Sequence, residues 1–346
     1  MRQVFQQKSY LCSPFNSVWS GMKVIVDNKI PYISEAIEKI ADEVVYMPGG
    51  AIGRDVVRDA DALIVRTRTR CDKDLLEGSK VKFIGTATIG FDHIDTDYCH
   101  ESGIAWCNCP GCNAGAVAQY VESALLLLEQ ERGLCLRNSC LGIVGVGHVG
   151  SHVLSVAGRL GMRVLLNDPP RYDRGGHGFT GLQTLAEECD IITFHTPLYR
   201  SGRYCTYHLG DETFFRSLRK KPVIINTSRG EVLDTGSLIR AIDTGVVPAA
   251  VIDVWENEPN ISLDLLNRVY IGTPHIAGYS ADGKANATRM TLDALCRFFG
   301  KQVQYTIELP HQPYVPYDPR TDCVALRNNP SQFEQLRGDY PLRREK

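Results

Sequence analysis

A glycine-rich motif near the middle of the chain constrains its fold more than any other feature. Within 141–150, a short apolar run ends in three glycines with the spacing G-x-G-x-x-G: Gly145, Gly147 and Gly150. In a strand–turn–helix unit, the first glycine makes the tight turn and the second lets the backbone approach a pyrophosphate, while the third lets helix and strand pack closely. The pyrophosphate binds the free N–H groups at the helix N-terminus. The motif therefore predicts a dinucleotide-binding site.

A carboxylate after the next apolar run indicates which dinucleotide is bound. This run, at 162–167, is followed directly by Asp168. The spacing is close to the roughly 20 residues expected for an acid that binds a ribose 2′-hydroxyl. Because a carboxylate would repel a 2′-phosphate, we predict NAD rather than NADP as the cofactor. The alternative is a glycine-rich turn in an α/β protein that binds no ligand.

Short apolar runs alternate with helical patterns on both sides of the motif. This alternation is typical of parallel sheets with crossover helices, so we predict an α/β fold. Besides the two runs at the motif, the predicted strands are 23–26, 62–65, 81–84, 104–106, 190–194, 223–226 and 249–252. The predicted helices are 34–42, 72–77, 113–131, 211–218, 235–243 and 281–299.

The position of the motif in the chain predicts how its domains are organised. The chain has 346 residues, enough for about two domains, and an α/β pattern precedes the motif. We therefore predict two Rossmann-like domains with parallel sheets, the NAD-binding domain being inserted into a flavodoxin-like substrate-binding domain. The expected boundaries are an N-terminal extension at 1–21, a substrate-binding domain at 22–112 plus 280–300, an NAD-binding domain at 113–279, and a linker with a shortened C-terminal segment at 301–346.

Composition and charge narrow the class of protein. The net charge of −2 gives no field that would attract nucleic acid or a membrane surface. No apolar run approaches the ~20 residues that span a bilayer, and the leading residues lack the apolar core of a signal peptide. The 12 cysteines are scattered, and Cys107, Cys109 and Cys112 lack a second paired set for a zinc site. We predict a cytoplasmic enzyme with reduced cysteines and no metal, nucleic-acid or membrane partner.

Three polar clusters after the motif contain groups suited to acid–base chemistry. Arg229 directly follows a predicted strand, and its planar fork matches a substrate carboxylate. Glu258 precedes Pro259 and so lies in an extended or turn conformation. His275 lies in a loop bounded by proline and glycine, and histidine suits proton transfer near neutral pH. Singly, such residues are more often structural, but together they supply what oxidation of an alcohol by NAD requires.

The sequence resembles the D-isomer-specific 2-hydroxyacid dehydrogenase family over roughly 22–300. The matching motifs are 145–150, 226–230, 258–259 and 274–275. Longer strings are similar to one branch of that family, at 22–28, 85–93, 110–113, 168–170, 194–197, 253–256 and 275–280. The branch implies NAD-dependent oxidation of 4-phospho-D-erythronate to 2-oxo-3-hydroxy-4-phosphobutanoate, in pyridoxal 5′-phosphate (vitamin B6) biosynthesis.

The resemblance implies a role for each matching residue. The implied catalytic residues are Arg229, Glu258 and His275, with His275 as the proton donor and acceptor. The implied NAD contacts are Gly145, Gly147, His148, Val149, Gly150, Asp168, Thr196, Thr227, Ser228, Asp253 and Gly278. The implied substrate contacts are Thr67, Thr88 and Tyr279.

The residues leave several properties open. Arg66, Arg68 and Arg70 alternate after a predicted strand and would point to one side in a strand-like tail. They, or Lys284, are candidates for binding the substrate phosphate, although alternating arginines often only solvate a strand end. The resemblance implies a homodimer and, if NAD stays bound, a 2-oxo acid as electron acceptor. The alternatives are a dehydrogenase of another D-2-hydroxy acid, such as phosphoglycerate, and a non-catalytic NAD-sensing binding protein.

Overall fold

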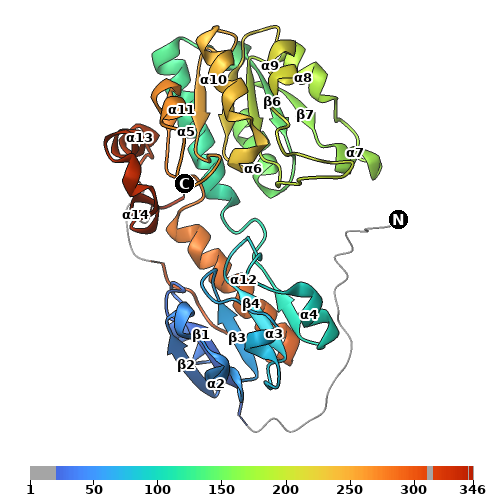
Figure 1. Ribbon diagram of the computed structural model, residues 1–346, viewed down its shortest axis with the longest axis vertical. Coiled ribbons are helices and arrows are strands. Elements are labelled where there is room, and N and C mark those ends of the chain that lie inside the picture. The colour runs from blue at the N-terminus through green and yellow to red at the C-terminus, as the bar shows by residue number, and fades with distance from the viewer. Residues whose placement is uncertain (1–20, 310–314, 342, 346) are drawn as a thin grey trace. The chain divides into compact units, whose positions relative to one another are not determined.

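The computed structural model describes residues 21–309, 315–341 and 343–345. The N-terminal extension expected at 1–21 lies, apart from Gly21, outside the described residues, as do 310–314 of the expected linker. The chain divides into two compact units, each with its own parallel sheet (Figure 1). Of the described residues, the first unit comprises 21–112 and Lys284–Leu309, and the second comprises Asn113–Gly283 and those from 315 onward.

The first unit is built on a five-stranded parallel sheet with the order β2-β1-β3-β4-β5. The strands are β1 (Lys23–Asp27), β2 (Glu43–Met47), β3 (Ala62–Val65), β4 (Phe83–Thr86) and β5 (Ala105–Cys107). The central strands β3 and β4 are buried throughout, which explains their continuous apolar runs in the sequence. The sequence did not predict β2, because this edge strand is half-exposed and carries charged and polar residues.

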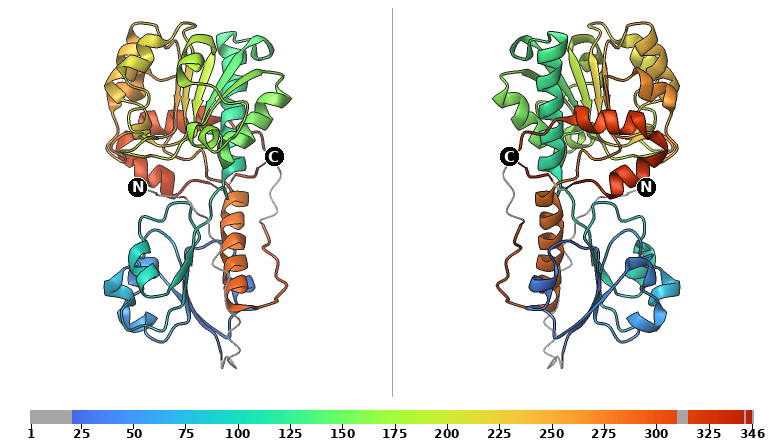
Figure 2. Two further views of the ribbon diagram at one scale, coloured as in Figure 1. Left: turned by 90° about the vertical axis from the view of Figure 1, so that its right-hand side faces the viewer. Right: turned by 90° about the vertical axis from the view of Figure 1, so that its left-hand side faces the viewer.

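Helices cover both faces of this sheet. On one face, α1 and α12 contribute to a single buried cluster with the strands, and Figure 2 shows α12 in orange along the sheet. On the other face, α2, α3 and α4 bury their apolar residues. The helices are α1 (Ser34–Ile37), α2 (Arg54–Val57), α3 (Lys73–Leu76), α4 (Thr96–Glu101) and α12 (Ala281–Phe299).

The second unit is built on a six-stranded parallel sheet with the order β11-β10-β9-β8-β6-β7. The strands are β6 (Cys140–Val144), β7 (Arg163–Asn167), β8 (Ile191–Phe194), β9 (Val223–Asn226), β10 (Ala250–Ile252) and β11 (Ile271–Gly272). Because β6 lies between β7 and β8, the strand order reverses there. Ligands of open α/β sheets bind at such a switch point, at the carboxyl ends of the strands.

Two layers of helices cover this second sheet. On one face lie α5 (Ala114–Arg132) and α6 (His148–Arg159). On the other lie α8 (Leu182–Glu188), α9 (Glu212–Ser217), α10 (Thr235–Asp243) and α11 (Leu263–Arg268). The short helix α7 (Pro169–Asp173) follows β7, and 3-10 turns occur at Gly49–Ala51, Leu136–Asn138, Gly230–Val232 and Pro330–Gln332.

The C-terminal segment differs from the expected linker and charged tail. It forms α13 (Pro319–Asn328) and α14 (Phe333–Gly338), which belong to the second unit. Leu326 and Phe333 are fully buried in that unit, and the backbone N–H of Gly272 in β11 donates to Cys323 Sγ at 3.3 Å. The segment therefore covers the edge strand β11, which would otherwise present unpaired backbone groups. The buried residues of α13, Pro319, Cys323 and Leu326, follow a helical spacing that the sequence analysis did not identify among the many charged residues of this segment.

The structure also shows the state of the cysteines and the length of the apolar helices, two features considered from the composition. Cys109 Sγ lies 3.1 Å from the Ala287 carbonyl oxygen, so this thiol is a buried hydrogen-bonding and packing group. None of the eleven cysteines that the structure describes forms a disulfide. Within the described ranges, no helix is long and apolar enough to cross a bilayer.

Candidate active site

The glycine-rich turn joins β6 to α6 at the switch point of the second sheet. Gly145 has a φ of +87°, and a Cβ there would lie 2.8 Å from the carbonyl oxygen of His195. A Cβ on Gly150 would overlap the carbonyl oxygen of Gly145. Both positions therefore require glycine. No described atom lies within 4 Å of a Cβ built on Gly147, so this side of the turn is open and fits the approach of a pyrophosphate to the start of α6.

Asp168 lies immediately after β7, beside the glycine-rich turn. Its Oδ2 accepts a hydrogen bond from the Val146 backbone N–H at 2.9 Å, and its Oδ1 accepts one from the Arg171 backbone N–H at 2.9 Å. The carboxylate thus joins the turn to the start of α7. This is the place in which the sequence predicted the ribose-binding acid, and its contact with a ribose stays a prediction. His148 and Val149 are the first two residues of α6, and His148 is exposed.

The end of β8 contains a buried histidine that the sequence did not single out. His195 Nε2 lies 2.9 Å from Thr193 Oγ1, and its Nδ1 lies 3.1 Å from Thr227 Oγ1. Burial lowers the pKa of His195 to about 3, so the ring is neutral. The neighbouring Thr196 hydroxyl is buried and has no hydrogen-bond partner among the described residues. An unsatisfied buried hydroxyl beside the glycine-rich turn fits a site that is completed by a bound dinucleotide.

Arg229 lies on a turn after β9 that the side chain of Asn226 holds. Asn226 Oδ1 accepts from the backbone N–H and the hydroxyl of Ser228, and its Nδ2 donates to the Arg229 carbonyl oxygen at 2.9 Å. The next residue, Gly230, packs closely on the backbone of Trp255. A Cβ at this position would overlap the Trp255 carbonyl group. The turn is therefore rigid, while Arg229 itself is exposed. The sequence motif contained Asn226 without revealing its role, which depends on contacts within the turn.

Glu258 and His275 form a direct acid–base pair. His275 Nδ1 lies 2.8 Å from Glu258 Oε2, and Glu258 Oε1 accepts from the backbone N–H of Trp255 at 2.9 Å. Burial raises the pKa of Glu258, but the hydrogen bonds from His275 and from the Trp255 backbone N–H outweigh burial, and this pKa lies below its usual value. Since an ionised carboxylate can only accept, Nδ1 carries the proton and Nε2 is left with the lone pair. The pair therefore presents a histidine in the tautomer that a general base needs.

Asp253 organises the loop that carries His275. Its buried carboxylate accepts from the Thr273 hydroxyl at 2.6 Å and from the backbone N–H groups of Ile276 and Ala277 at 2.8 and 3.0 Å. The backbone N–H of His275 donates to the Asp253 carbonyl oxygen, and His275 has a left-handed φ of 57°. Such strained conformations are common at functional sites. The carboxylate of this predicted NAD contact is thus engaged in holding the loop, and its contact with NAD stays a prediction.

The two other predicted residues of this loop pack on separate elements. A Cβ on Gly278 would overlap the Asn113 side chain, which requires glycine at that point. The Tyr279 hydroxyl accepts a hydrogen bond from Arg337 Nε at 3.2 Å. The second unit therefore brings together Glu258, His275 and Tyr279 through contacts with their neighbours.

The first unit contains the other two predicted substrate contacts. Thr67 is exposed in a turn that directly follows β3. Thr88 donates from Oγ1 to the Gly90 carbonyl oxygen at 2.8 Å and lies 2.6 Å from Thr86 Oγ1. Both threonines thus lie just beyond the carboxyl ends of central strands, where ligands of such sheets bind.

The sequence suggested that the alternating arginines point to one side of an extended strand. The structure does not show this arrangement. The backbone N–H of Thr69 donates to the Arg66 carbonyl oxygen, so the chain turns after β3. Arg70 pairs instead with Asp72 at 2.8 Å. Lys284 is half-buried, and burial together with the positive charge of Arg66 lowers its pKa. Among the candidates for the phosphate, the structure brings Arg66 and Lys284 near each other.

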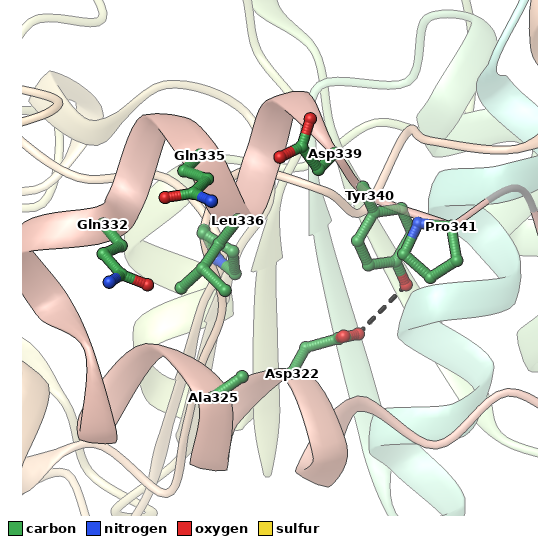
Figure 3. Close-up of a pocket in the computed structure, with 9 residues that line it drawn as sticks. Asp322, Ala325, Gln332, Gln335, Leu336, Asp339, Tyr340 and Pro341 are labelled. Atoms are coloured by element: carbon green, nitrogen blue, oxygen red, sulfur yellow. Dashed lines mark hydrogen bonds between the residues drawn. The ribbon is translucent and has the colours of Figure 1, made fainter.

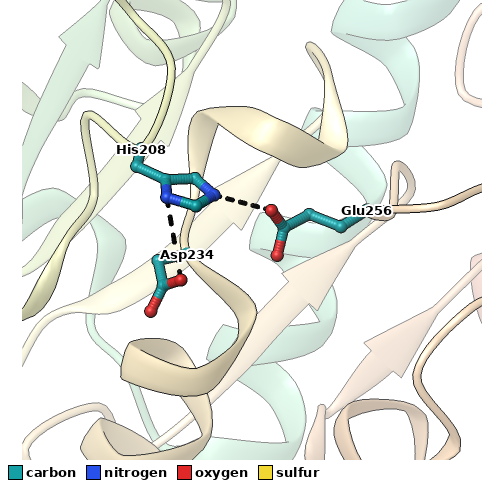
Figure 4. Close-up of side chains that lie close together, drawn as sticks. All are labelled: His208, Asp234 and Glu256. Carbon is teal, nitrogen blue, oxygen red and sulfur yellow. Dashed lines mark hydrogen bonds and ion pairs between the residues drawn. The ribbon is translucent and has the colours of Figure 1, made fainter.

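A further cluster of His208, Asp234 and Glu256 lies in the second unit (Figure 4). His208 Nε2 lies 2.7 Å from Glu256 Oε1, whereas its Nδ1 lies 3.7 Å from Asp234 Oδ2. The carboxylates also accept backbone hydrogen bonds at the start of α10. Because the two ring nitrogens face different carboxylates, the geometry suits a bridging histidine better than a ligand to one metal ion. The cluster ties the chain before α9 to the start of α10 and the Asp253–Glu258 loop.

Comparisons with known proteins match the whole of this architecture. The model of the D-isomer specific 2-hydroxyacid dehydrogenase NAD-binding domain matches residues 118–277. The chain is 61% identical over 338 residues to erythronate-4-phosphate dehydrogenase of Bacteroides fragilis, covering 94% of this chain and 97% of that protein. It is 43% identical to the protein of the same name from Porphyromonas gingivalis, covering 94% of each. The NAD⁺-bound 3-phosphoglycerate dehydrogenase of Entamoeba histolytica has a TM-score of 0.66 at 26% identity, covering 86% of this chain and 100% of that chain.

Proposed function

Because the chain belongs to the D-isomer-specific 2-hydroxyacid dehydrogenase family, we propose that it oxidises 4-phospho-D-erythronate with NAD in vitamin B6 biosynthesis. The product is 2-oxo-3-hydroxy-4-phosphobutanoate. The observation that carries this function is the pairing of Glu258 with His275 in the same unit as the glycine-rich turn. The substrate follows from the relatives named erythronate-4-phosphate dehydrogenase, which align with 94% of the chain.

The catalytic roles follow from the protonation states of the pair. His275 Nε2 accepts the proton of the substrate C2 hydroxyl, because Nδ1 already carries a proton, which it donates in a hydrogen bond to Glu258. The Glu258 carboxylate then stabilises the positive charge that forms on the imidazole ring. Arg229 binds the substrate carboxylate with its planar guanidinium group. When bound, NAD supplies the acceptor for the C2 hydride.

We assign NAD to the second unit, which includes the range 113–279 expected for the NAD-binding domain together with 280–283 and the C-terminal segment. The turn of Gly145, Gly147 and Gly150 and the start of α6, with His148 and Val149, would hold the pyrophosphate. Asp168 would accept from the adenosine ribose hydroxyls. The unsatisfied Thr196 hydroxyl would bond to the cofactor. Further contacts are proposed for Thr227, Ser228, Asp253 and Gly278.

We assign substrate binding to the first unit, together with Tyr279. Thr67 and Thr88 are proposed to contact the substrate, Thr67 as a hydrogen-bond donor and Thr88 as an acceptor, because the Thr88 hydroxyl already donates to the Gly90 carbonyl oxygen. Arg66 and Lys284 are proposed to bind its phosphate, because the positive charge of Arg66 acts on Lys284 and both are cations of the first unit. A guanidinium and an ammonium group together complement the charge of a phosphate monoester.

We make three further proposals, of which the location rests on the composition and the scattered cysteines, and the other two rest on the family resemblance. The protein acts in the cytoplasm as a homodimer. A 2-oxo acid reoxidises NADH that stays bound. Addition of 2-oxoglutarate to the purified protein tests the last proposal, since turnover that requires this acceptor indicates a retained cofactor.

The decisive experiment compares candidate substrates with one preparation of protein. The absorbance of reduced nicotinamide and the oxo-acid product are measured with 4-phospho-D-erythronate, 3-phosphoglycerate and D-lactate, each with and without 2-oxoglutarate. Preference for 4-phospho-D-erythronate supports the proposal. Preference for another acid would support the proposed NAD-dependent mechanism but contradict the assignment of 4-phospho-D-erythronate as the substrate. The absence of any product from protein shown to bind NAD would favour a non-catalytic NAD sensor.

A further inference from the structure

The C-terminal segment is anchored on the second unit at several points. We call residues 317–345 of this segment the C-terminal arm. Phe333 at the start of α14 is fully buried, and the Tyr340 hydroxyl donates to Asp322 Oδ2 at 3.0 Å. Figure 3 shows this hydrogen bond beside a pocket whose walls come from α13, α14 and the residues that follow. Pro274, next to His275, also lines the pocket. The arm therefore packs beside the start of the catalytic loop.

The end of the arm binds the catalytic loop itself. Arg343 donates from its guanidinium group to the carbonyl oxygens of Ile276 and Ala277, which directly follow His275. The Glu345 carboxylate accepts from the Ser280 hydroxyl at 2.6 Å. These contacts join backbone and side-chain groups more than 60 positions apart in the chain. The position of the arm and the position of the loop are therefore coupled.

Between these anchors, Arg337 on α14 contacts the catalytic pair. Its Nε donates to the Tyr279 hydroxyl at 3.2 Å, and its Nη1 lies 3.9 Å from Glu258 Oε2. That oxygen is the one to which His275 Nδ1 is bonded. Glu334, one turn earlier in α14, lies 3.8 Å from Arg337 Nη1 but is largely exposed. Arg337 thus contributes a half-buried positive charge on the side of Glu258 that faces the arm.

We propose that Arg337 is a positioning residue that holds Glu258 and Tyr279 in place for His275, so that the C-terminal arm takes part in catalysis. The titratable groups facing the Glu258 carboxylate are His275, which donates a hydrogen bond from Nδ1, and Arg337, which carries a positive charge. Both oppose the effect of burial and keep Glu258 ionised. The inference rests on the proposed function in that His275 is the base. Direct binding of the substrate by Arg337 is the competing role.

The charge and the shape of the guanidinium group make separable contributions. An ammonium group retains the positive charge near Glu258 but lacks the planar fork that directs Nε toward Tyr279. Arg337→Lys therefore keeps the charge, whereas Arg337→Met removes it at similar length. Arg320→Met is the matched control, because Arg320 lies on the same arm but pairs with Asp318 and Glu131 instead.

The first test is the pH dependence of kcat and kcat/KM for the three variants. Arg337→Met is expected to lower kcat by roughly 10- to 100-fold, as for small misplacements of catalytic groups. Removing the cation raises the pKa of Glu258, so activity lost on acidification is lost at a higher pH than in the wild type. Arg337→Lys is expected to lose activity on acidification at the same pH as the wild type, but with a lower kcat. Arg320→Met is expected to match the wild type both in kcat and in the pH at which activity is lost. A raised KM with an unshifted acid limb would instead identify a substrate ligand and overturn the proposal.

The second test requires no turnover. Hydrogen exchange of the backbone amides at 275–280 is expected to be faster in Arg337→Met than in Arg320→Met, because the Tyr279 anchor is lost. Equal exchange in the two variants would overturn the positioning role. If the wild type fails to oxidise 4-phospho-D-erythronate, the proposed function fails, while this measurement still decides whether the arm holds the loop.

Discussion

The two units share a doubly wound parallel architecture but differ at the carboxyl ends of their strands. In the second unit, Asn226 fixes the turn after β9 that carries Arg229, and Asp253, after β10, holds the loop of His275, after β11. In the first unit, Thr67 lies in an exposed turn. The catalytic pair of the second unit thus lies in a network of buried hydrogen bonds, whereas Thr67 of the first unit is exposed.

This difference distinguishes the positioning of catalytic groups from the binding of the substrate. Catalytic groups need a geometry that is fixed before the reaction, and loops locked by buried hydrogen bonds supply it. Groups that only bind a charged substrate tolerate more freedom. We therefore expect substitutions of the catalytic pair and the glycine-rich turn in the second unit to lower kcat or NAD affinity, and substitutions of the substrate contacts in the first unit to raise KM.

The largest effect is expected for His275→Ala. Removal of the general base should lower kcat by roughly 10²- to 10⁴-fold, while NAD affinity changes little. The measurements are steady-state turnover of 4-phospho-D-erythronate and calorimetric titration with NAD. A folded variant that no longer binds NAD would show that the two functions of the second unit are not separable.

Gly150→Ala tests the glycine-rich turn. The added Cβ would overlap the Gly145 carbonyl oxygen, so we expect loss of NAD affinity and a fall of about 1–3 kcal/mol in the free energy of unfolding. Gly158→Ala in the same helix is the matched control, because no described atom lies within 4 Å of its Cβ. That control should raise the helix stability by up to about 1 kcal/mol. Equal behaviour in denaturant unfolding and NAD titration would refute the close-packing argument.

Lys284→Met tests recognition by the first unit. Loss of a charged hydrogen bond of about 1.5–3 kcal/mol should raise KM for 4-phospho-D-erythronate roughly 10- to 100-fold with little change in kcat. Because the pKa of Lys284 is lowered, its charge is lost as pH rises through that value, so the wild-type KM should rise at a lower pH than for an ordinary lysine. Lys301→Met, at a residue that faces Asp42, is the control. A fall in kcat with constant KM would contradict the assignment of substrate binding to the first unit and of catalysis to the second.

The smallest effect is expected for Thr67→Val. An exposed neutral hydroxyl contributes about 0.5–1.5 kcal/mol as a hydrogen-bond donor, so KM should rise roughly 2- to 10-fold. Substrate titration of the steady-state rate measures the change, and thermal unfolding should show the same stability as the wild type. If KM is unchanged, Thr67 has no contact with the substrate.

Local patterns predicted much of the fold. The expected ranges 62–65, 223–226, 235–243 and 281–299 coincide with β3, β9, α10 and α12. These elements have continuous apolar runs or a clear helical period, because they are buried on both faces or along one stripe. The half-exposed β2 lacks such a pattern. The helix α13 has a helical spacing of buried residues, but it is short and rich in charged residues, and the sequence analysis did not identify it.

By itself, the sequence determined the glycine-rich turn, the acid after β7 and the residue types of the catalytic set, because each depends on spacing within a short stretch. Only the tertiary structure decided that Glu258 orients His275, that the buried carboxylate of Asp253 holds the loop, and that Arg337 reaches both Glu258 and Tyr279. Arg337 and Tyr279 are 58 positions apart. Hydrogen bonds over such separations depend on how strands and helices pack, and that information has no local period in the chain.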